Sequence, residues 1–251
     1  MTMTLLFLPF MAAMAGTPDA QTLLGQVEDL GTRRIDKSAP KINLKQVAEV
    51  LGGGLVSGVE VVEEVKAGKG YALGIFDIPI ELLWRGVSDE DHHAEFMAAD
   101  VSKTVDGVAR RDGHTLLQYM KMPIISDRWW VVQMTFNSSL YQSSNGKVWE
   151  VAWKDRQGDS NLIASLDQTL IGEGVPIRWA KGSWLLIDLG GGKTFVMYHT
   201  WSDPGGRIPV ALGTRIAAGQ VKNNLIEMTN FSKNHARTCP GDFFRPDGSP
   251  L

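Results

Sequence analysis

Two kinds of hydrophobic pattern follow one another in the first third of the chain. Apolar residues at helical spacing predict one helix over residues 17–35 and another over 44–51. Alternating, β-branched residues then predict strands over 59–65 and 71–78, joined by a glycine-rich turn. The N-terminal part is therefore expected to contribute two helices and a β-hairpin.

Strand patterns dominate the middle of the chain. Two short helices are expected before them, one after Pro79 and one that Ser88 and Asp89 cap, running to Met97. The later strand-like segments are 101–109, 115–122, 129–136, 148–153, 176–189 and 194–201. Clusters of glycine, asparagine and aspartate separate them, which is typical of hairpin turns and predicts an antiparallel sheet.

An amphipathic helix is expected near the C-terminus, from Pro209 to about Ala236. Its apolar face carries Val210, Ala217, Val221, Leu225 and Met228. A helix of this length must bury its apolar face, and the sheet is the one large partner. The pattern therefore predicts an α+β fold, in which a curved antiparallel sheet wraps around the helix and leaves an apolar cavity, where small ligands usually bind.

Composition narrows the classes of function. The 251 residues carry a net charge of −3, whereas proteins that bind nucleic acid usually present a basic face. The single cysteine, Cys239, excludes an internal disulfide and a Cys-based zinc site. All eight tryptophans lie between Trp84 and Trp201, and tryptophan is frequent in cores and ligand pockets. Neither a repeat nor a linker divides the chain, so one domain is expected.

Residues 1–15 have the pattern of a leader. An uncharged apolar run ends in Ala13-Met14-Ala15, which is typical of a signal-peptide cleavage site, and it is too short to span a bilayer. However, no Lys or Arg precedes Arg33, so the α-amino group is the one positive charge. We favour export, to the periplasm or outside the cell; the alternative is an apolar arm packed on a cytoplasmic domain.

The patterns that could indicate catalysis, phosphate binding or metal binding lack the spacing or the flanking elements that these functions require. Strand-like segments flank residues 190–194 on both sides, so a glycine hairpin is expected rather than a phosphate-binding loop. The acidic and histidine-rich run 89–95 lacks the spacing of a metal site and is interpreted as a solvated helix start. His199 lies in a strand and is interpreted as a structural, hydrogen-bonded group. No catalytic residue, metal or cofactor is predicted.

Two strands gather large apolar residues on one face each. The even-numbered residues of 129–136 share an apolar face, and so do the odd-numbered residues of 148–153. These faces, which we expect to point inward, hold Trp130, Val132, Met134, Phe136, Trp149, Val151 and Trp153. Such residues either fill a core or surround a cavity, and the pattern allows both.

Two motifs resemble those of the StAR-related lipid-transfer (START) domain family. Residues 121–131, Lys-Met-Pro-Ile-Ile-Ser-Asp-Arg-Trp-Trp-Val, are similar to its strand-bend-strand signature. Residues 202–209, Ser-Asp-Pro-Gly-Gly-Arg-Ile-Pro, are similar to its turn into the last helix. The resemblance runs from about Leu23 to Ala236 and leaves 162–175 without a counterpart. It extends more weakly to the wider superfamily that includes polyketide cyclases and plant pathogenesis-related proteins.

The resemblance implies a helix-grip fold and an apolar cavity, in which family members hold sterols, phospholipids or other hydrophobic molecules. Together with the leader pattern, it divides the chain into the leader 1–15, a START-like lipid-binding domain over 16–237 and an irregular tail over 238–251. Arg128 matches the motif arginine. The resemblance implies one of two roles for Arg128. It could pair with Asp127 or hold a ligand's polar head, or it could fix the strand bend through backbone carbonyls.

We therefore expect a non-enzymatic protein that binds and transfers a lipid or other hydrophobic molecule, with transient membrane contact. The alternatives are an aromatase- or cyclase-like enzyme acting on a polyketide-type substrate in the same cavity, and an interaction module with a solid core. A cavity of about several hundred Å³ would separate the first two from the third. The expected ligand contacts are Trp84, Tyr119, Arg128, Trp130, Met134, Trp149, Trp153, Met197, His199, Trp201, Ala217, Val221, Leu225 and Met228.

Overall fold

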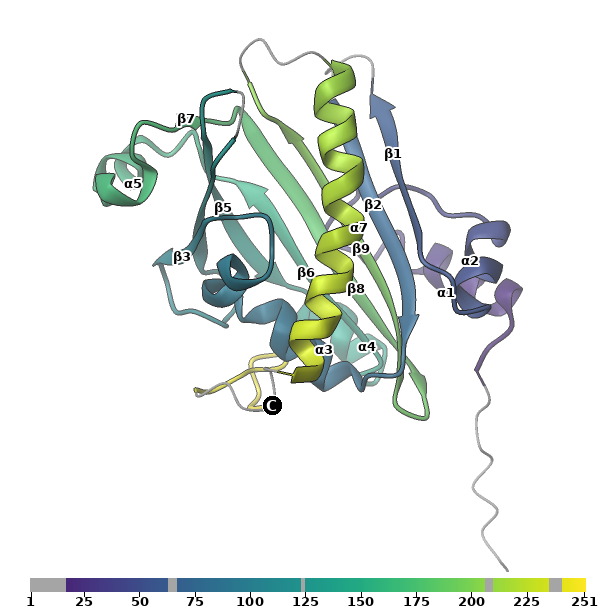
Figure 1. Ribbon diagram of the computed structural model, residues 1–251. Helices are drawn as coiled ribbons and strands as arrows, with labels where there is room; N and C mark the ends of the chain where they lie inside the picture. Colours follow the sequence, from purple (N-terminus) through teal and green to yellow (C-terminus); the bar gives the residue numbers. More distant parts are fainter. Residues whose placement is uncertain (1–16, 63–66, 123–124, 206–209, 235–240) are drawn as a thin grey trace, which may run out of the picture.

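One antiparallel sheet forms the centre of the computed structural model (Figure 1). The structure describes residues 17–62, 67–122, 125–205, 210–234 and 241–251. Within these residues the strand order is β1-β2-β9-β8-β6-β5-β4-β3, and β7 pairs with β5 off this path. The predicted leader, residues 1–15, lies outside the described residues, as does Cys239.

The strands confirm the predicted antiparallel sheet. They are β1 (Val56–Val62), β2 (Ala67–Phe76), β3 (Val101–Asp106), β4 (Thr115–Met120), β5 (Arg128–Phe136), β6 (Val148–Asp155), β7 (Val175–Pro176), β8 (Trp179–Gly190) and β9 (Lys193–Asp203). Neighbours are antiparallel except the short β5–β7 pair, which is parallel. Because β9 pairs with both β2 and β8, the last strand joins the first hairpin to the rest of the sheet.

The helices differ from the predicted ones mainly where they are short. They are α1 (Ala20–Asp29), α2 (Leu44–Leu51), α3 (Ile80–Ser88), the 3₁₀ helix η2 (Glu90–Glu95), α4 (Ser138–Ser143), α5 (Ser160–Ser165), α6 (Gln168–Ile171) and α7 (Val210–Asn234). The bounds of α2 match the prediction, and α7 lies within its predicted range. The helix α1 is shorter than predicted because Asp19 caps its start and the chain turns after Leu30. The helices α4, α5 and α6 are too short to give a periodic pattern.

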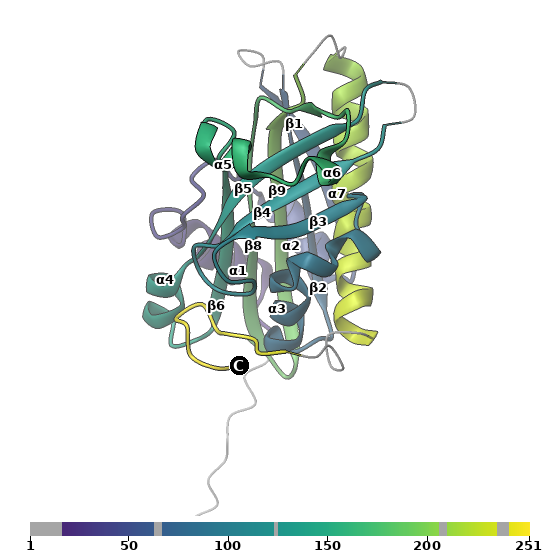
Figure 2. The same ribbon diagram turned by 90° about the vertical axis from the view of Figure 1, so that its left-hand side faces the viewer.

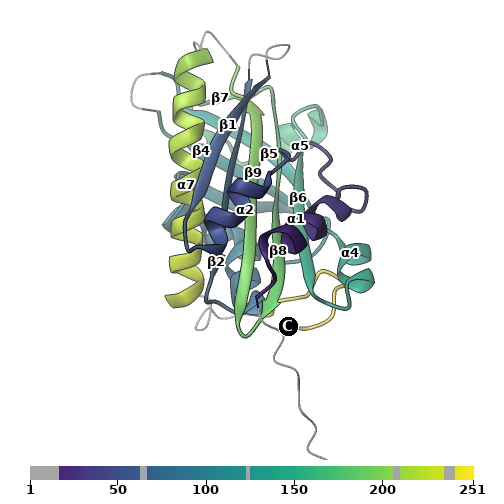
Figure 3. The same ribbon diagram turned by 90° about the vertical axis from the view of Figure 1, so that its right-hand side faces the viewer.

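The sheet has a helical layer on each face. The helix α7 crosses one face, where it packs against β1, β2 and β9 (Figure 1), and Figure 2 shows it along one side of β3, β4 and β5. We call this the inner face. The helices α1 and α2 lie against the opposite face, which we call the outer face (Figure 3). No helix among the described residues is both long and apolar enough to cross a membrane.

The inner face carries the larger apolar cluster. Val132, Met134 and Phe136 of β5 belong to it, as do Trp149 and Val151 of β6, which confirms the inward faces predicted for these strands. Three residues of α7 complete it: Val221, Leu225 and Met228. The helix thus buries the apolar face that the sequence predicted; the side chain of Ala217 lies outside the described ones.

The outer face is also apolar. Leu23 of α1 and Val47 of α2 pack there with Leu185 of β8 and Met197 of β9. Further along the sheet, Leu162, Leu166 and Ile171 of the α5–α6 segment cover Leu117, Trp129 and Val131. Strands β5, β8 and β9 are therefore buried on both sides.

Candidate ligand-binding site

A small pocket lies on the inner face, between the sheet and the segment that begins with η2. Its volume is about 40 Å³, which is room for about three water molecules. A typical small-molecule site is several times larger, about 300 Å³ or more, so this pocket does not reach the volume expected to separate a ligand-binding protein from an interaction module with a solid core. The pocket is lined by Glu90, His93, Met97, Leu116, Gln118, Val132, Met134, Trp153, Trp184 and Tyr198.

Strand alternation explains which side chains reach the pocket. Residues of one parity on each strand face inward, so β4 contributes Leu116 and Gln118, and β5 contributes Val132 and Met134. Trp153 comes from β6 by the same rule. Most of the lining is therefore apolar, which suits a hydrophobic ligand.

Tyr198 and Trp184 form the aromatic wall of the pocket. Their rings stack with centroids 4.0 Å apart, and the Tyr198 hydroxyl accepts a hydrogen bond from Asn224 of α7 at 3.3 Å. Burial raises the pKa of Tyr198 to about 12, so its hydroxyl stays protonated at neutral pH and does not serve as a base.

Three predicted contact residues lie at or beside the pocket. Met134 and Trp153 line it. Trp130 packs against the inner cluster and donates its indole N–H to Oε1 of Gln118 at 2.9 Å. On α7, Val221, Leu225 and Met228 are buried in the same cluster without lining the pocket.

Trp84 and Trp149 fill the core instead of surrounding a space. Their rings meet edge to face at 5.4 Å, and Phe136 lies 4.9 Å from Trp84. Each indole N–H donates to a backbone carbonyl, that of Phe244 at 2.7 Å and that of Gly146 at 2.6 Å. Both rings are thus fixed structural elements of the inner cluster.

Four residues expected to line the cavity lie on the outer face. Met197 packs with α1 and α2, and His199 is buried on the same side. Alternation puts Trp201 there too, beneath Lys181 at 4.3 Å. Tyr119 packs beside Trp129 and donates its hydroxyl to the Asp127 carboxylate. These side chains therefore face away from the pocket. Both faces of these strands are apolar, so hydrophobicity alone does not identify the inner one.

Arg128 fixes the strand bend. Its Nε donates to the Pro204 carbonyl at 2.9 Å, and Nη1 donates to the carbonyls of Ser126 and Asp127. The Asp127 carboxylate instead accepts from Tyr119 and from the backbone N–H of Met122. Of the roles implied by the resemblance, these contacts match the one through backbone carbonyls.

The acidic start of η2 is buried, which corrects the prediction of a solvated helix start. Asp89 and Glu90 are 0% and 1% exposed. Oδ1 of Asp89 forms an ion pair with Arg110, 2.6 Å from Nη2, and Glu90 faces His114 at 3.5 Å. The interpretation failed because both partners lie about twenty residues away in the sequence, after β3. Glu90 is the charged group that sequence reasoning missed in the pocket.

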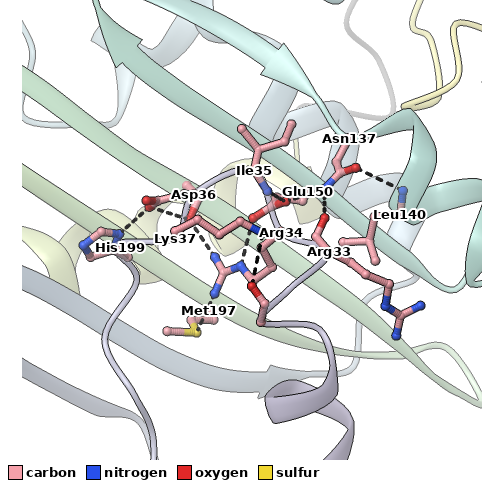
Figure 4. Close-up of polar contacts among 12 residues, drawn as sticks. Arg33, Arg34, Ile35, Asp36, Lys37, Asn137, Leu140, Glu150, Met197 and His199 are labelled. Atoms are coloured by element: carbon pink, nitrogen blue, oxygen red, sulfur yellow. Dashed lines mark hydrogen bonds and ion pairs between the residues drawn. The ribbon is translucent and has the colours of Figure 1, made fainter.

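A second polar cluster lies on the outer face, beneath the segment that follows α1 (Figure 4). The Glu150 carboxylate is fully buried and accepts from Nε of Arg34 at 2.8 Å, the N–H of Ile35 at 2.8 Å and Nδ2 of Asn137 at 2.7 Å. Arg34 also donates to the Ser183 hydroxyl at 2.7 Å. These bonds attach the N-terminal segment to the sheet.

His199 and Asp36 belong to the same cluster (Figure 4). Nδ1 of His199 lies 2.9 Å from Oδ2 of Asp36. Burial lowers the pKa of His199, and its hydrogen bond to Asp36 opposes this only in part. Burial would raise the pKa of Asp36, but hydrogen bonds from His199 and Ser38 outweigh it and hold the pKa below its usual range. His199 is therefore a neutral donor to a carboxylate.

This histidine–carboxylate pair does not serve the pocket. The Ser183 hydroxyl bonds to Arg34 and Asp36, not to His199, and the pair lies on the other face of the sheet. In the described part of the chain, the pair is a structural attachment, and the aromatase or cyclase alternative rests on the resemblance alone. The described residues also include no group of three or more side chains placed to hold a metal ion.

Comparison with known proteins agrees with the helix-grip architecture. No protein-family model and no curated protein matches the chain. Solved structures do: a STAR-related lipid transfer protein from Xanthomonas axonopodis is similar over 72% of this chain and 94% of its own, with 17% identity and a TM-score of 0.59. Human StAR-related lipid transfer protein 5 is similar over 85% of this chain and 96% of its own, with 12% identity and a TM-score of 0.58. The chain therefore has a START-like helix-grip fold.

Proposed function

We propose that this protein binds a lipid or a similar hydrophobic molecule between the inner face of its sheet and α7. The observation that carries the proposal is the pocket on that face, whose lining is mostly apolar and includes two tryptophans. The lipid-transfer proteins with the same fold support it. Transfer of apolar ligand surface from water into such a site gains about 25 cal/mol per Å².

Binding of a whole lipid requires the site to widen. The pocket volume of about 40 Å³ is too small for an acyl chain or a sterol. The helix α7 holds the inner cluster closed through Val221, Leu225 and Met228. Movement of α7 away from the sheet would open space beside the pocket, as closing elements do in many binding proteins.

Native mass spectrometry of the protein purified from its own host tests the proposal. We expect an added mass that denaturation releases and that identifies the ligand class. Titration with short-chain phospholipid and with a sterol should also change the fluorescence of Trp153 and Trp184, which line the pocket. A protein that carries no small molecule and shows no change in either titration would contradict the proposal.

A matched pair of variants assigns binding to the inner face. Leu116 and Leu117 are neighbours on β4 and are 2% and 0% exposed, but only Leu116 lines the pocket. Leu116→Phe and Leu117→Phe should each cost about 1–3 kcal/mol of stability through overpacking. We expect only Leu116→Phe to weaken ligand binding, about tenfold. Equal weakening by both variants would place the ligand elsewhere.

We further propose that the protein transfers its ligand between membranes and that it is exported. Transfer is tested by movement of a labelled lipid between donor and acceptor vesicles, which should increase with protein concentration. For export, the intact mass of the protein recovered from its host should correspond to cleavage after Ala15. A retained leader would instead favour the cytoplasmic alternative.

A further inference from the structure

Glu90 is a buried carboxylate with open hydrogen-bonding capacity at the edge of the pocket. It lines the pocket and is 1% exposed, yet neither Oε1 nor Oε2 has a hydrogen-bond partner among the described residues. Buried carboxylates in folded proteins are nearly always hydrogen-bonded, because leaving one unpaired costs free energy. An orphaned group of this kind at a pocket indicates a missing partner.

The contrast with Glu150 shows that this protein can satisfy a buried glutamate. Glu150 is 0% exposed on the outer face and accepts hydrogen bonds from Arg34, Ile35 and Asn137. Glu90 receives no such bond. The two side chains are equally buried, so the difference lies in their partners and not in their distance from solvent.

His114, the group nearest Glu90, forms an ion pair with it but no hydrogen bond. Nε2 of His114 is 3.5 Å from Oε2 and likewise has no hydrogen-bond partner among the described residues, while Nδ1 lies 2.5 Å from the Arg111 carbonyl. Burial opposes protonation of His114, but the nearby charge of Glu90 and the hydrogen bond to the Arg111 carbonyl outweigh it and raise the pKa of His114. The neighbouring Asp89 forms an ion pair with Arg110, and His93 contacts the Gly86 carbonyl at 3.2 Å.

The other polar side chains of the lining already have partners. Gln118 accepts from Trp130 at 2.9 Å and donates to Ser102 at 3.2 Å. The Tyr198 hydroxyl accepts from Asn224. Among these lining side chains, Glu90 is therefore the one whose oxygens accept no hydrogen bond. Such oxygens favour a ligand group that donates a hydrogen bond.

We propose that Glu90 orients the ligand by accepting a hydrogen bond from a hydroxyl or amine at the end of an otherwise apolar molecule, and that it disfavours an anionic head. The inference rests on the proposed binding of a hydrophobic molecule in this pocket and adds the chemistry of the ligand's polar end. A carboxylate repels another carboxylate, whereas a donor satisfies it.

Three probes with one chain length test this selectivity: decanol, decylamine and decanoic acid. We expect the wild-type protein to bind the alcohol or the amine at least about tenfold more tightly than the acid. The alcohol and amine arms show which donor the site prefers. Glu90→Gln should retain binding but reduce the preference to about twofold or less, because the amide does not repel the acid. Glu95→Gln, on the exposed side of η2, should behave as wild type.

Two results would overturn the inference while leaving hydrophobic binding intact: equal affinity of the wild-type protein for all three probes, or an unchanged preference in Glu90→Gln. Binding of none of the probes would overturn the proposed function as well. The melting temperature of the ligand-free protein supplies an independent readout. Glu90→Gln should melt at or above the wild-type temperature, whereas Glu150→Gln should melt lower. Comparable losses in both variants would show that Glu90 is structural and overturn the inference.

Discussion

Arg34 and Glu150 form the buried ion pair that attaches the N-terminal segment to the sheet. Nε of Arg34 lies 2.8 Å from Oε1 of Glu150, and the side chains are 5% and 0% exposed. Arg34→Met keeps an apolar stem but leaves the Glu150 charge without its cation. Loss of one partner of a buried pair costs about 3–5 kcal/mol. Because Glu150 keeps its donors Ile35 and Asn137, we expect the lower end, about 3 kcal/mol.

Denaturant unfolding followed by tryptophan fluorescence measures this loss. The midpoint should fall while the slope stays unchanged, since a stability change alone does not alter the surface exposed on unfolding. For a chain of this size the melting temperature should fall by about 6–12 °C. Arg33→Met is the matched control, because Arg33 is adjacent and exposed; its effect should stay within about 0.5 kcal/mol.

A loss for Arg34→Met no greater than that for Arg33→Met would refute the reasoning. A second variant tests the role of charge itself. Glu150→Gln in the Arg34→Met background should restore part of the stability, because it removes the uncompensated charge. A further loss in that double variant would show that hydrogen-bond geometry, and not charge, dominates the cluster.

Two further predictions concern the neighbouring strands. At Gly182, an added Cβ would overlap the Trp153 ring and the His199 carbonyl, so Gly182→Ala should lower the free energy of unfolding by about 1–3 kcal/mol, measured with denaturant. Gly158 has open space around it, so Gly158→Ala should change this free energy little. Equal losses in the two variants would contradict the packing at Gly182. Burial holds the pKa of His199 below 6.5. As pH falls, His199 is therefore protonated more readily in the unfolded chain than in the folded protein. The contribution of His199 to stability is thus present above pH 6.5 and declines below it. The stability difference between wild type and His199→Asn should shrink from pH 7 to pH 5, by at most about 1.4 kcal/mol per pH unit, and an unchanged difference would count against a neutral folded-state histidine.

The inward-facing residues of a strand were predictable where its two faces differ in polarity. The alternation in β6 places Trp153 opposite the fully buried Glu150, so the apolar face was correctly assigned as the inner one. On β9 the same reasoning had no polar face to use, since Phe195 and Met197 are buried on one side and Val196 and Tyr198 on the other. Hydrophobic periodicity does not distinguish the faces of a strand that is covered on both sides.

Charged residues show the other limit of sequence reasoning. An acidic run such as 89–95 is usually solvated, because burial of a charge is costly without a partner. Glu90 is nevertheless buried against His114, and Asp89 against Arg110. These partners come from the β3–β4 connection, and no local spacing links them to η2. Arg34 and Glu150 are separated by an even longer stretch of chain.

The sequence by itself determined the class of fold: the spacing of apolar residues in α7, the alternation in β5 and β6 and the hairpin turns between strands predict an antiparallel sheet packed on an amphipathic helix. These patterns are local, because each depends on residues within one element. Only the tertiary structure decided which residues surround the pocket, that Trp84 and Trp149 fill the core, and that Glu90 is buried without a hydrogen-bond partner. Those properties depend on the volumes and charges that distant segments bring together, which periodicity does not record.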